Sequence, residues 1–101
     1  MRKLRSFDEY LIESLKDPTE AALYLNACMD ENDPVLLLDA LRLVAKAHGM
    51  TRMSKQISLS RMGLHKALSK GGNPQLKTFL NILEASGIQL IFKPKDLKKA
   101  A

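Results

Sequence analysis

The sequence has little cysteine or histidine and no long apolar run, and each shortage excludes a class of protein. The single cysteine, Cys28, excludes an internal disulfide and fits a reducing cytosol. No apolar run approaches the roughly 20 residues that a membrane-spanning helix needs. The basic first five residues (MRKLR) are followed by acidic helix-forming sequence, so we expect no signal peptide. At 101 residues, the chain predicts one globular domain with a modest core.

The residue patterns of enzymes and metal proteins are also missing. The two histidines, His48 and His65, have no spacing that would make a metal site with each other or with Cys28. The acidic run at residues 30–33 lacks the glycine and the glutamate that a calcium loop needs. No serine or cysteine lies in a nucleophile motif, and no glycine-rich phosphate loop follows a strand. We therefore expect no catalysis, no metal and no cofactor.

Charge is divided unevenly along the chain. Residues 1–34 carry four cations and eight anions, a net charge of −4, whereas residues 35–101 carry twelve cations and three anions, a net charge of +9. A basic region attracts a polyanion such as DNA, and an acidic region attracts a basic protein. The division favours two different partners, although two solvated surfaces of uneven charge would also account for it.

Start signals in the first half predict three helices. A capping box at residues 6–9 (Ser6 with Glu9) opens the first helix, which runs to about residue 15. Asp17-Pro18 opens the second helix and Asp33-Pro34 the third, because aspartate caps free N–H groups and proline suits the first helical position. Gly49 ends the third helix by adopting the left-handed conformation. The predicted core residues of these helices are Phe7, Tyr10, Leu11, Leu15, Ala21, Ala22, Leu25, Cys28, Met29, Leu37, Leu38, Leu41, Val44 and Ala45.

Residues 50–69 predict two short helices joined by a tight turn, the arrangement that places a helix in the major groove of DNA. Thr51 is expected to cap the first helix and Ser60 the second. The inward-facing residues are Met53, Ile57, Leu59, Leu64 and Leu68, and the outward-facing residues of the second helix are Arg61, Met62, His65, Lys66 and Ser69. An outward face with two cations and no acid suits anionic DNA, although many solvated helices share it.

The rest of the chain predicts one more helix and one strand. Gly71 and Gly72 end the preceding helix, and Asn73-Pro74 starts the next, which closes at residues 86–87 and has an apolar face made of Leu76, Phe79, Leu80 and Leu83. Residues 88–92 read as a strand with one face made of Ile88, Leu90 and Phe92. A lone strand cannot satisfy its own backbone groups, so it must pair with the N-terminal region, a second copy or another chain.

These pieces, in this order, resemble a known family. Residues 35–92 are similar to the Cro/C1-type (XRE-like) helix-turn-helix domain, through Met53-Ser54, Leu59-Ser60-Arg61 and Asn73-Pro74 followed by Leu76, Phe79 and Leu80. More narrowly, residues 59–69 followed by Gly72-Asn73-Pro74 look like the antidote proteins of bacterial addiction modules, and Glu9-Tyr10-Leu11 and Tyr24-Leu25-Asn26 extend the likeness to nearly the whole chain. Ser58 stands where the family often has glycine, so we expect its backbone to be less left-handed than usual.

The resemblance implies an all-α fold of the lambda-repressor-like type, with five to six helices and one short C-terminal β-strand. Residues 1–33 would be an N-terminal helical segment for toxin binding or dimer extension, residues 34–94 the DNA-binding domain, and residues 95–101 a mobile basic tail. The function implied is that of a bacterial cytoplasmic antitoxin. Such a homodimer binds a palindromic operator in double-stranded DNA, represses its own operon and neutralises a small basic toxin, commonly of the RelE/ParE type.

The predicted site residues fall into three sets. Arg61 reads a guanine edge or contacts a phosphate, Met62 contacts a thymine methyl or neighbouring protein, and His65 and Lys66 lie one turn further along, where His65 is as readily a plain surface residue. The predicted phosphate contacts are Thr51, Arg52, Lys55, Gln56, Ser60, Gly72 and Asn73, the last two offering free N–H groups before a helix start. The predicted toxin contacts, unless the N-terminal helices only complete the core, are Tyr10, Glu13, Glu20, Tyr24 and Asp30.

Two alternatives to the antitoxin remain open. An ordinary or phage-type XRE-like regulator would have the same DNA-binding domain and no toxin partner. A protein-interaction module would use the same helical scaffold and have no DNA site, which the +9 charge of residues 35–101 disfavours.

Overall fold

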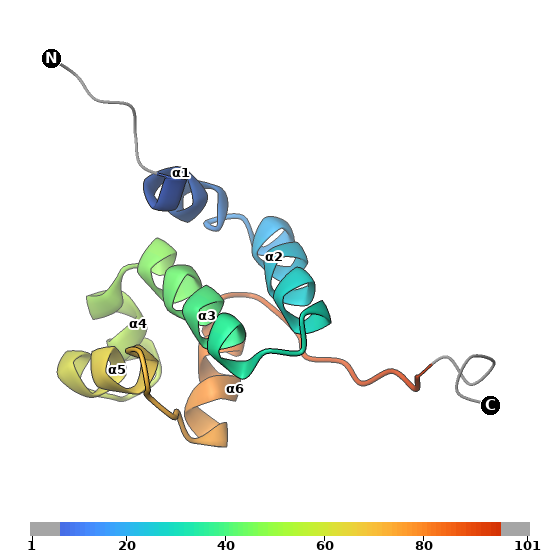
Figure 1. Ribbon diagram of the computed structural model, residues 1–101. Helices are drawn as coiled ribbons and strands as arrows, with labels where there is room; N and C mark the ends of the chain where they lie inside the picture. The colour runs from blue at the N-terminus through green and yellow to red at the C-terminus, as the bar shows by residue number, and fades with distance from the viewer. Residues whose placement is uncertain (1–6, 96–101) are drawn as a thin grey trace, which may run out of the picture.

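A computed structural model describes residues 7–95, apart from the side chain of Asp8, and this range folds into six helices (Figure 1). They are α1 (Phe7–Ser14), α2 (Pro18–Asp30), α3 (Pro34–His48), α4 (Met50–Gln56), α5 (Arg61–Leu68) and α6 (Leu76–Ala85). The predicted all-α class is confirmed over these residues. Within residues 7–95, no helix is both long enough and apolar enough to cross a lipid bilayer.

Helix α3 lies in the middle of the molecule (Figure 1). Helices α1 and α2 pack against one side of it, and α4 and α5 against another. Four α3 side chains are almost completely buried: Ala40, Leu41, Val44 and Ala45. They belong to one apolar core that also contains Leu25 of α2, Met53 of α4, Leu64 of α5 and Ile82 of α6. The acidic N-terminal helices and the cationic helices therefore share a single core.

Both predicted Asp-Pro helix starts are confirmed. The Asp17 Oδ1 atom accepts a hydrogen bond from the Thr19 N–H at 3.0 Å, and the Asp33 Oδ1 atom accepts one from the Val35 N–H at the same distance. Gly49 ends α3 with a φ angle of 95°. The first predicted capping box depends on Ser6, which lies outside the described residues.

Two other predicted helix starts are wrong. Only Gly49 separates α3 from α4, so α4 begins at Met50 and Thr51 is its second residue rather than its cap. Helix α6 begins at Leu76 after Gln75, not at Asn73-Pro74. Pro74 and Leu37 of α3 line the same groove, and Gln75, the residue before α6, has an extended backbone. The predicted end of α6 at residues 86–87 is confirmed.

Several apolar residues predicted for the core are exposed. Phe7 and Tyr10 of α1 are 74% and 67% exposed. Helix α1 lies at the edge of the molecule, where it packs against α3 and covers Leu11 and Leu15 instead (Figure 1). The same difference applies to Met29, Leu76 and Leu80. Helical spacing identifies an apolar face, but the tertiary packing decides how much of that face is covered.

The predicted C-terminal strand is also wrong, since no strand occurs between residues 7 and 95. After Gly87 the chain runs beside α2 and passes its C-terminal end (Figure 1). The Ile88 N–H donates to the Leu83 carbonyl at 2.9 Å, but no backbone hydrogen bond joins residues 89–95 to another described residue. A strand needs a second strand as a partner, and the described part of one copy of the chain supplies only helices.

Candidate nucleic-acid interface

Helices α4 and α5 form a pair whose inner side packs against the apolar core. They pack against each other and against α3 (Figure 1). Met53, Leu64 and Leu68 are completely buried beneath the pair, and Ile57 and Leu59 are half-buried at the turn. The predicted inward-facing residues are therefore confirmed. Because five apolar side chains fix the pair from within, its outer surface has a defined shape.

The turn between these helices is a Schellman motif, built around a serine. The Ser58 N–H donates to the Lys55 carbonyl at 3.3 Å, and the Leu59 N–H donates to the Ser54 carbonyl at 2.9 Å. Ser58 has a φ angle of 57°, so the expectation of a less left-handed backbone there is wrong. The hydrogen bonds and the inward-facing Leu59 side chain hold Ser58 in a conformation that glycine adopts more readily.

Ser60 caps α5, as predicted. Its Oγ atom accepts a hydrogen bond from the Gly63 N–H at 2.9 Å. A Cβ atom on Gly63 would lie 3.0 Å from that oxygen and 3.5 Å from the Leu59 Cγ atom. The missing side chain at residue 63 therefore makes room for the cap and the turn. Because the Ser60 oxygen accepts in this bond, its hydroxyl proton is still free to donate to the phosphate that was predicted for Ser60.

The four predicted base-reading residues share one exposed side of α5. Arg61, Met62, His65 and Lys66 are all exposed. They occupy two adjacent positions on each of two successive helical turns, so they form a continuous strip opposite the buried Leu64 and Leu68. Their contacts with bases remain predictions.

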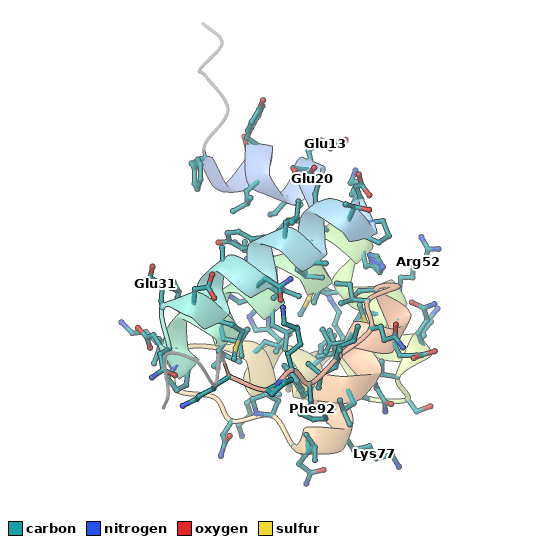
Figure 2. All side chains as sticks on the ribbon, turned by 90° about the vertical axis from the view of Figure 1, so that its right-hand side faces the viewer. Glu13, Glu20, Glu31, Arg52, Lys77 and Phe92 are labelled. Atoms are coloured by element: carbon teal, nitrogen blue, oxygen red, sulfur yellow. The ribbon has the colours of Figure 1, made fainter. Side chains whose placement is uncertain are left out.

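The predicted phosphate contacts of α4 lie on a neighbouring exposed surface. Thr51, Arg52, Lys55 and Gln56 are all exposed, and Arg52 projects from the edge of the molecule in Figure 2. The sequence has eight lysines and arginines, and no aspartate or glutamate, between Asp39 and Glu84. Because no carboxylate of this stretch offsets the cations, the surface of α4 and α5 has a positive potential.

The free N–H expected at Gly72 does not exist. The Gly72 N–H donates to the Ser69 carbonyl at 2.7 Å. A Cβ atom on Gly72 would lie only 2.3 Å from the Ala67 carbonyl oxygen, so glycine is needed here because the backbone passes close to the end of α5. Asn73 is exposed, as a phosphate contact must be, but it lies before Gln75 and does not begin α6.

The sequence analysis missed Arg42, a half-buried residue of α3. Its Nη1 atom donates to the Leu68 carbonyl at 2.9 Å, and its Nη2 atom donates to the Asp39 Oδ1 atom at 2.8 Å. The guanidinium thus joins α3 to the C-terminal end of α5, where backbone carbonyls carry partial negative charge. The spacing of Asp39 and Arg42 is the only local feature that could have drawn attention to the residue.

His48 makes a second link beside the helix pair. Its Nε2 atom lies 3.1 Å from the Ala85 carbonyl oxygen, which joins the end of α3 to the end of α6. Burial lowers the pKa of His48, and the nearby Arg52 guanidinium lowers it further. A neutral imidazole with its proton on Nε2 donates this hydrogen bond.

The five predicted toxin contacts lie on the other, acidic part of the molecule. Tyr10, Glu13, Glu20 and Asp30 are exposed on α1 and α2, and Tyr24 is half-buried. Figure 2 shows Glu13 and Glu20 at one end of the molecule and Lys77 at the opposite end. Arg52 of α4 lies between these two ends in the same view.

Cys28, the single cysteine, is buried in α2. Burial raises the pKa of its thiol, and the negative charges of Glu31 and Asp39 raise it further, against a hydrogen bond with Tyr24 that lowers it. A raised pKa keeps the sulfur protonated and weakly nucleophilic. Cys28 is therefore a small core residue, as predicted.

These features define a small helical protein in which a cationic helix pair and two acidic helices pack on different sides of α3. Residues 3–94 match the model of a family described as "probable addiction module antidote protein". The chain therefore belongs to this family, which implies a toxin partner of some kind. An uncharacterized protein of Haemophilus influenzae is 37% identical over 87 residues, which cover 86% of this chain and 88% of that protein. No solved structure matches the chain.

Proposed function

We propose that this protein is the antitoxin of a type II toxin–antitoxin module. In this proposal a homodimer binds a palindromic operator and represses its own operon, while the same chain neutralises a small basic toxin of the RelE/ParE type. The family supports the antitoxin role. The observation that carries the DNA-binding role is the acid-free, cationic outer surface of α4 and α5, which five apolar side chains fix from within.

DNA binding by this surface would follow the Cro/C1-type helix-turn-helix mode. Helix α5 enters the major groove, where Arg61 donates to the O6 and N7 atoms of a guanine and Met62 contacts a thymine methyl. His65 and Lys66 reach the next bases or the backbone. Exposed α4 residues, such as Arg52 and Lys55, contact phosphates and fix the orientation of the complex. Gly72 contributes through the shape of the chain after α5 rather than through its N–H.

The test of DNA binding is a gel-shift titration with two DNA fragments, the region upstream of the protein's own gene and a random sequence of equal length. We expect wild-type protein to prefer the upstream region. If Arg61 reads a base, Arg61→Ala weakens that specific complex by about 1–3 kcal/mol and leaves binding to random DNA nearly unchanged. Equal losses on both fragments would make Arg61 a phosphate contact.

Lys16→Ala is the matched control for this titration. Lys16 is an exposed cation between α1 and α2, paired with Glu13 at 3.2 Å, so removing it changes the net charge without touching α4 or α5. We expect it to leave both affinities nearly unchanged. A wild-type protein that binds the two fragments equally would contradict sequence-specific repression.

The test of toxin binding is co-purification with the product of the neighbouring gene. The exposed α1 and α2 residues can be changed without opening the core, whereas Tyr24 is half-buried beside Cys28. The double variant Tyr10→Ala/Glu13→Lys should release a basic toxin and still bind DNA, because neither residue lies on α4 or α5. If wild-type protein forms no complex with that product, the antitoxin assignment fails and a DNA-binding regulator without a toxin partner remains.

A further inference from the structure

Residues 88–92 are an exposed apolar segment without a partner in the described chain. Leu90, Ile91 and Phe92 are 47%, 67% and 90% exposed. The last backbone hydrogen bond of this region is donated by the Ile88 N–H, and residues 89–95 make none with the rest of the described chain. An extended segment with unpaired backbone groups and apolar side chains is a template for β-pairing with another chain.

We propose that residues 88–92 pair with the same residues of a second copy, in an antiparallel two-stranded ribbon centred on Leu90. In this register Leu90 lies opposite Leu90 of the partner subunit, and Ile88 lies opposite Phe92 of the partner subunit. Every residue of the apolar segment then meets another residue of that segment. A register shifted toward the C-terminus would bring Pro94, which has no N–H, into the ribbon.

The groove beside this segment gives the partner's Phe92 a place to pack. It has a volume of about 750 Å³ and is lined by residues of α2, α3, α6 and the segment itself, among them Leu25, Leu83 and Ile88. Directly opposite residues of an antiparallel pair lie on the same side of the ribbon. Phe92 of the partner subunit therefore lies next to Ile88, at the groove, and the symmetric contact forms in the other subunit.

Charge complementarity favours a second copy over another partner. In the same register, Lys93 of the partner subunit lies opposite Gly87. Gly87 is beside the start of α2, since a Cβ atom on it would lie 3.5 Å from the Pro18 Cγ atom. Asp17 caps α2 just before Pro18, and Glu20 lies in the first turn of the helix; both are exposed, so a partner lysine arrives at an acidic helix N-terminus. A basic protein other than a second copy would instead bring its cations close to Lys93, and the like charges would repel each other.

This interface deepens the proposed function and rests on its dimeric part, because a palindromic operator is read by a two-fold symmetric dimer. Its test needs no DNA, so the two proposals fail separately. A dimer that forms through residues 88–92 but binds no DNA would contradict only the proposed function. A protein that binds the upstream DNA and dimerises through another surface would overturn only this interface.

Single-cysteine cross-linking tests the register. In a Cys28→Ala background, Leu90→Cys should form a disulfide-linked dimer under mild oxidation, because the Cα atoms of directly opposite residues lie about 4.5–5.5 Å apart, within the range that a disulfide spans. Gln89→Cys and Ile91→Cys should each cross-link poorly alone and readily when mixed, since these residues lie opposite each other. Equal cross-linking of all three single variants, or none, would overturn the register.

Sedimentation of the full chain tests the interface itself. We expect Lys93→Glu to raise the dimer dissociation constant by about tenfold or more, and the added change Glu20→Lys to restore much of the affinity. Both residues are exposed, and a helical circular dichroism spectrum checks that each variant still folds. A wild-type monomer at all concentrations, or a Lys93→Glu dimer of unchanged affinity, would overturn the proposal.

Discussion

At residue 58 the chain holds a serine in the left-handed conformation, with a φ angle of 57°. This conformation costs a residue with a Cβ atom about 1–2 kcal/mol. Glycine avoids that cost but loses about 0.5–1 kcal/mol more through its freedom in the unfolded chain. We therefore expect Ser58→Gly to raise the free energy of unfolding by about 0.5–1 kcal/mol in urea denaturation.

Ser58→Ala is the control for this substitution. It removes the hydroxyl group but keeps the Cβ atom, so it retains the backbone strain and should not stabilise the protein. Equal stabilisation by alanine and glycine would show that the hydroxyl group, rather than the backbone conformation, is unfavourable.

The roles of single residues were predicted correctly where their hydrogen-bond partners are close along the chain. Asp17 and Asp33 each accept a hydrogen bond from an N–H two residues away, and both caps were predicted. The packing of Leu59 against the core, which helps to hold Ser58 in its conformation, instead depends on other helices. Gly72 is required by the position of the Ala67 carbonyl after α5 has folded. Neither cause is visible in a local pattern.

Among the helices, the position of α5 depends on Arg42. Replacing Arg42 with methionine keeps much of the apolar stem but leaves the Leu68 carbonyl without its charged donor. Since a hydrogen bond to a charged group contributes about 1.5–3 kcal/mol, we expect Arg42→Met to lower the free energy of unfolding by about that amount. The specific DNA complex should weaken as well, although Arg42 is not a predicted DNA contact.

Asp39→Asn is the matched variant for this experiment. It removes the charge that pairs with Arg42 and leaves the bond to Leu68 in place. The Asp39 side chain is 42% exposed, so its ion pair contributes only about 0–1 kcal/mol. Urea denaturation of both variants should show the larger loss for Arg42→Met. The reverse order would mean that the ion pair, not the link to α5, stabilises this region.

The link between α3 and α6 should depend on pH through His48. Its pKa is lowered in the folded protein by burial and by Arg52, so the unfolded chain binds a proton first as the pH falls. The unfolded state then holds more protons below about pH 6.5, and the free energy of unfolding decreases. Above that pH the neutral imidazole stabilises the fold in full.

Urea denaturation of wild-type protein and His48→Gln between pH 7.5 and about pH 5.5 measures this effect, above the range in which carboxylates titrate. We expect wild-type protein to lose more stability than the variant as the pH decreases, because glutamine has no charge to gain. Parallel curves for the two proteins would contradict this assignment.

The elements themselves were predicted with unequal success for a physical reason. A helix satisfies its backbone groups within its own segment, so the spacing of apolar residues predicted all six helices, although the predicted starts of α4 and α6 were wrong. A strand depends on a second segment, which the pattern of residues 88–92 does not identify. The exposure of Phe7 has a similar cause. The sequence of α1 alone does not determine which side of the helix packs against α3.

On the scale of the whole molecule, the division of charge between the acidic N-terminal helices and the cationic remainder of the chain was predicted from the sequence. The acidic helices α1 and α2 pack on one side of α3, and the cationic pair α4 and α5 packs on another (Figure 1). The shared core holds the two pairs in a fixed relative position, so each presents its own exposed surface. That one chain holds both partners was the prediction from the sequence, and it remains a prediction.

Salt should weaken the DNA complex steeply if the cations of α4 contact phosphates. Each contact releases about one counterion, so the logarithm of affinity falls against the logarithm of salt concentration with a slope of about −0.9 per contact. Lys55→Ala removes one contact from each subunit of a dimer, so the slope should become shallower by about 2. Lys16→Ala, which removes an exposed cation that belongs to neither α4 nor α5, should leave it unchanged. Fluorescence anisotropy across a salt series measures both slopes. A wild-type affinity that does not change with salt would mean that the cationic surface of α4 and α5 is not where DNA binds.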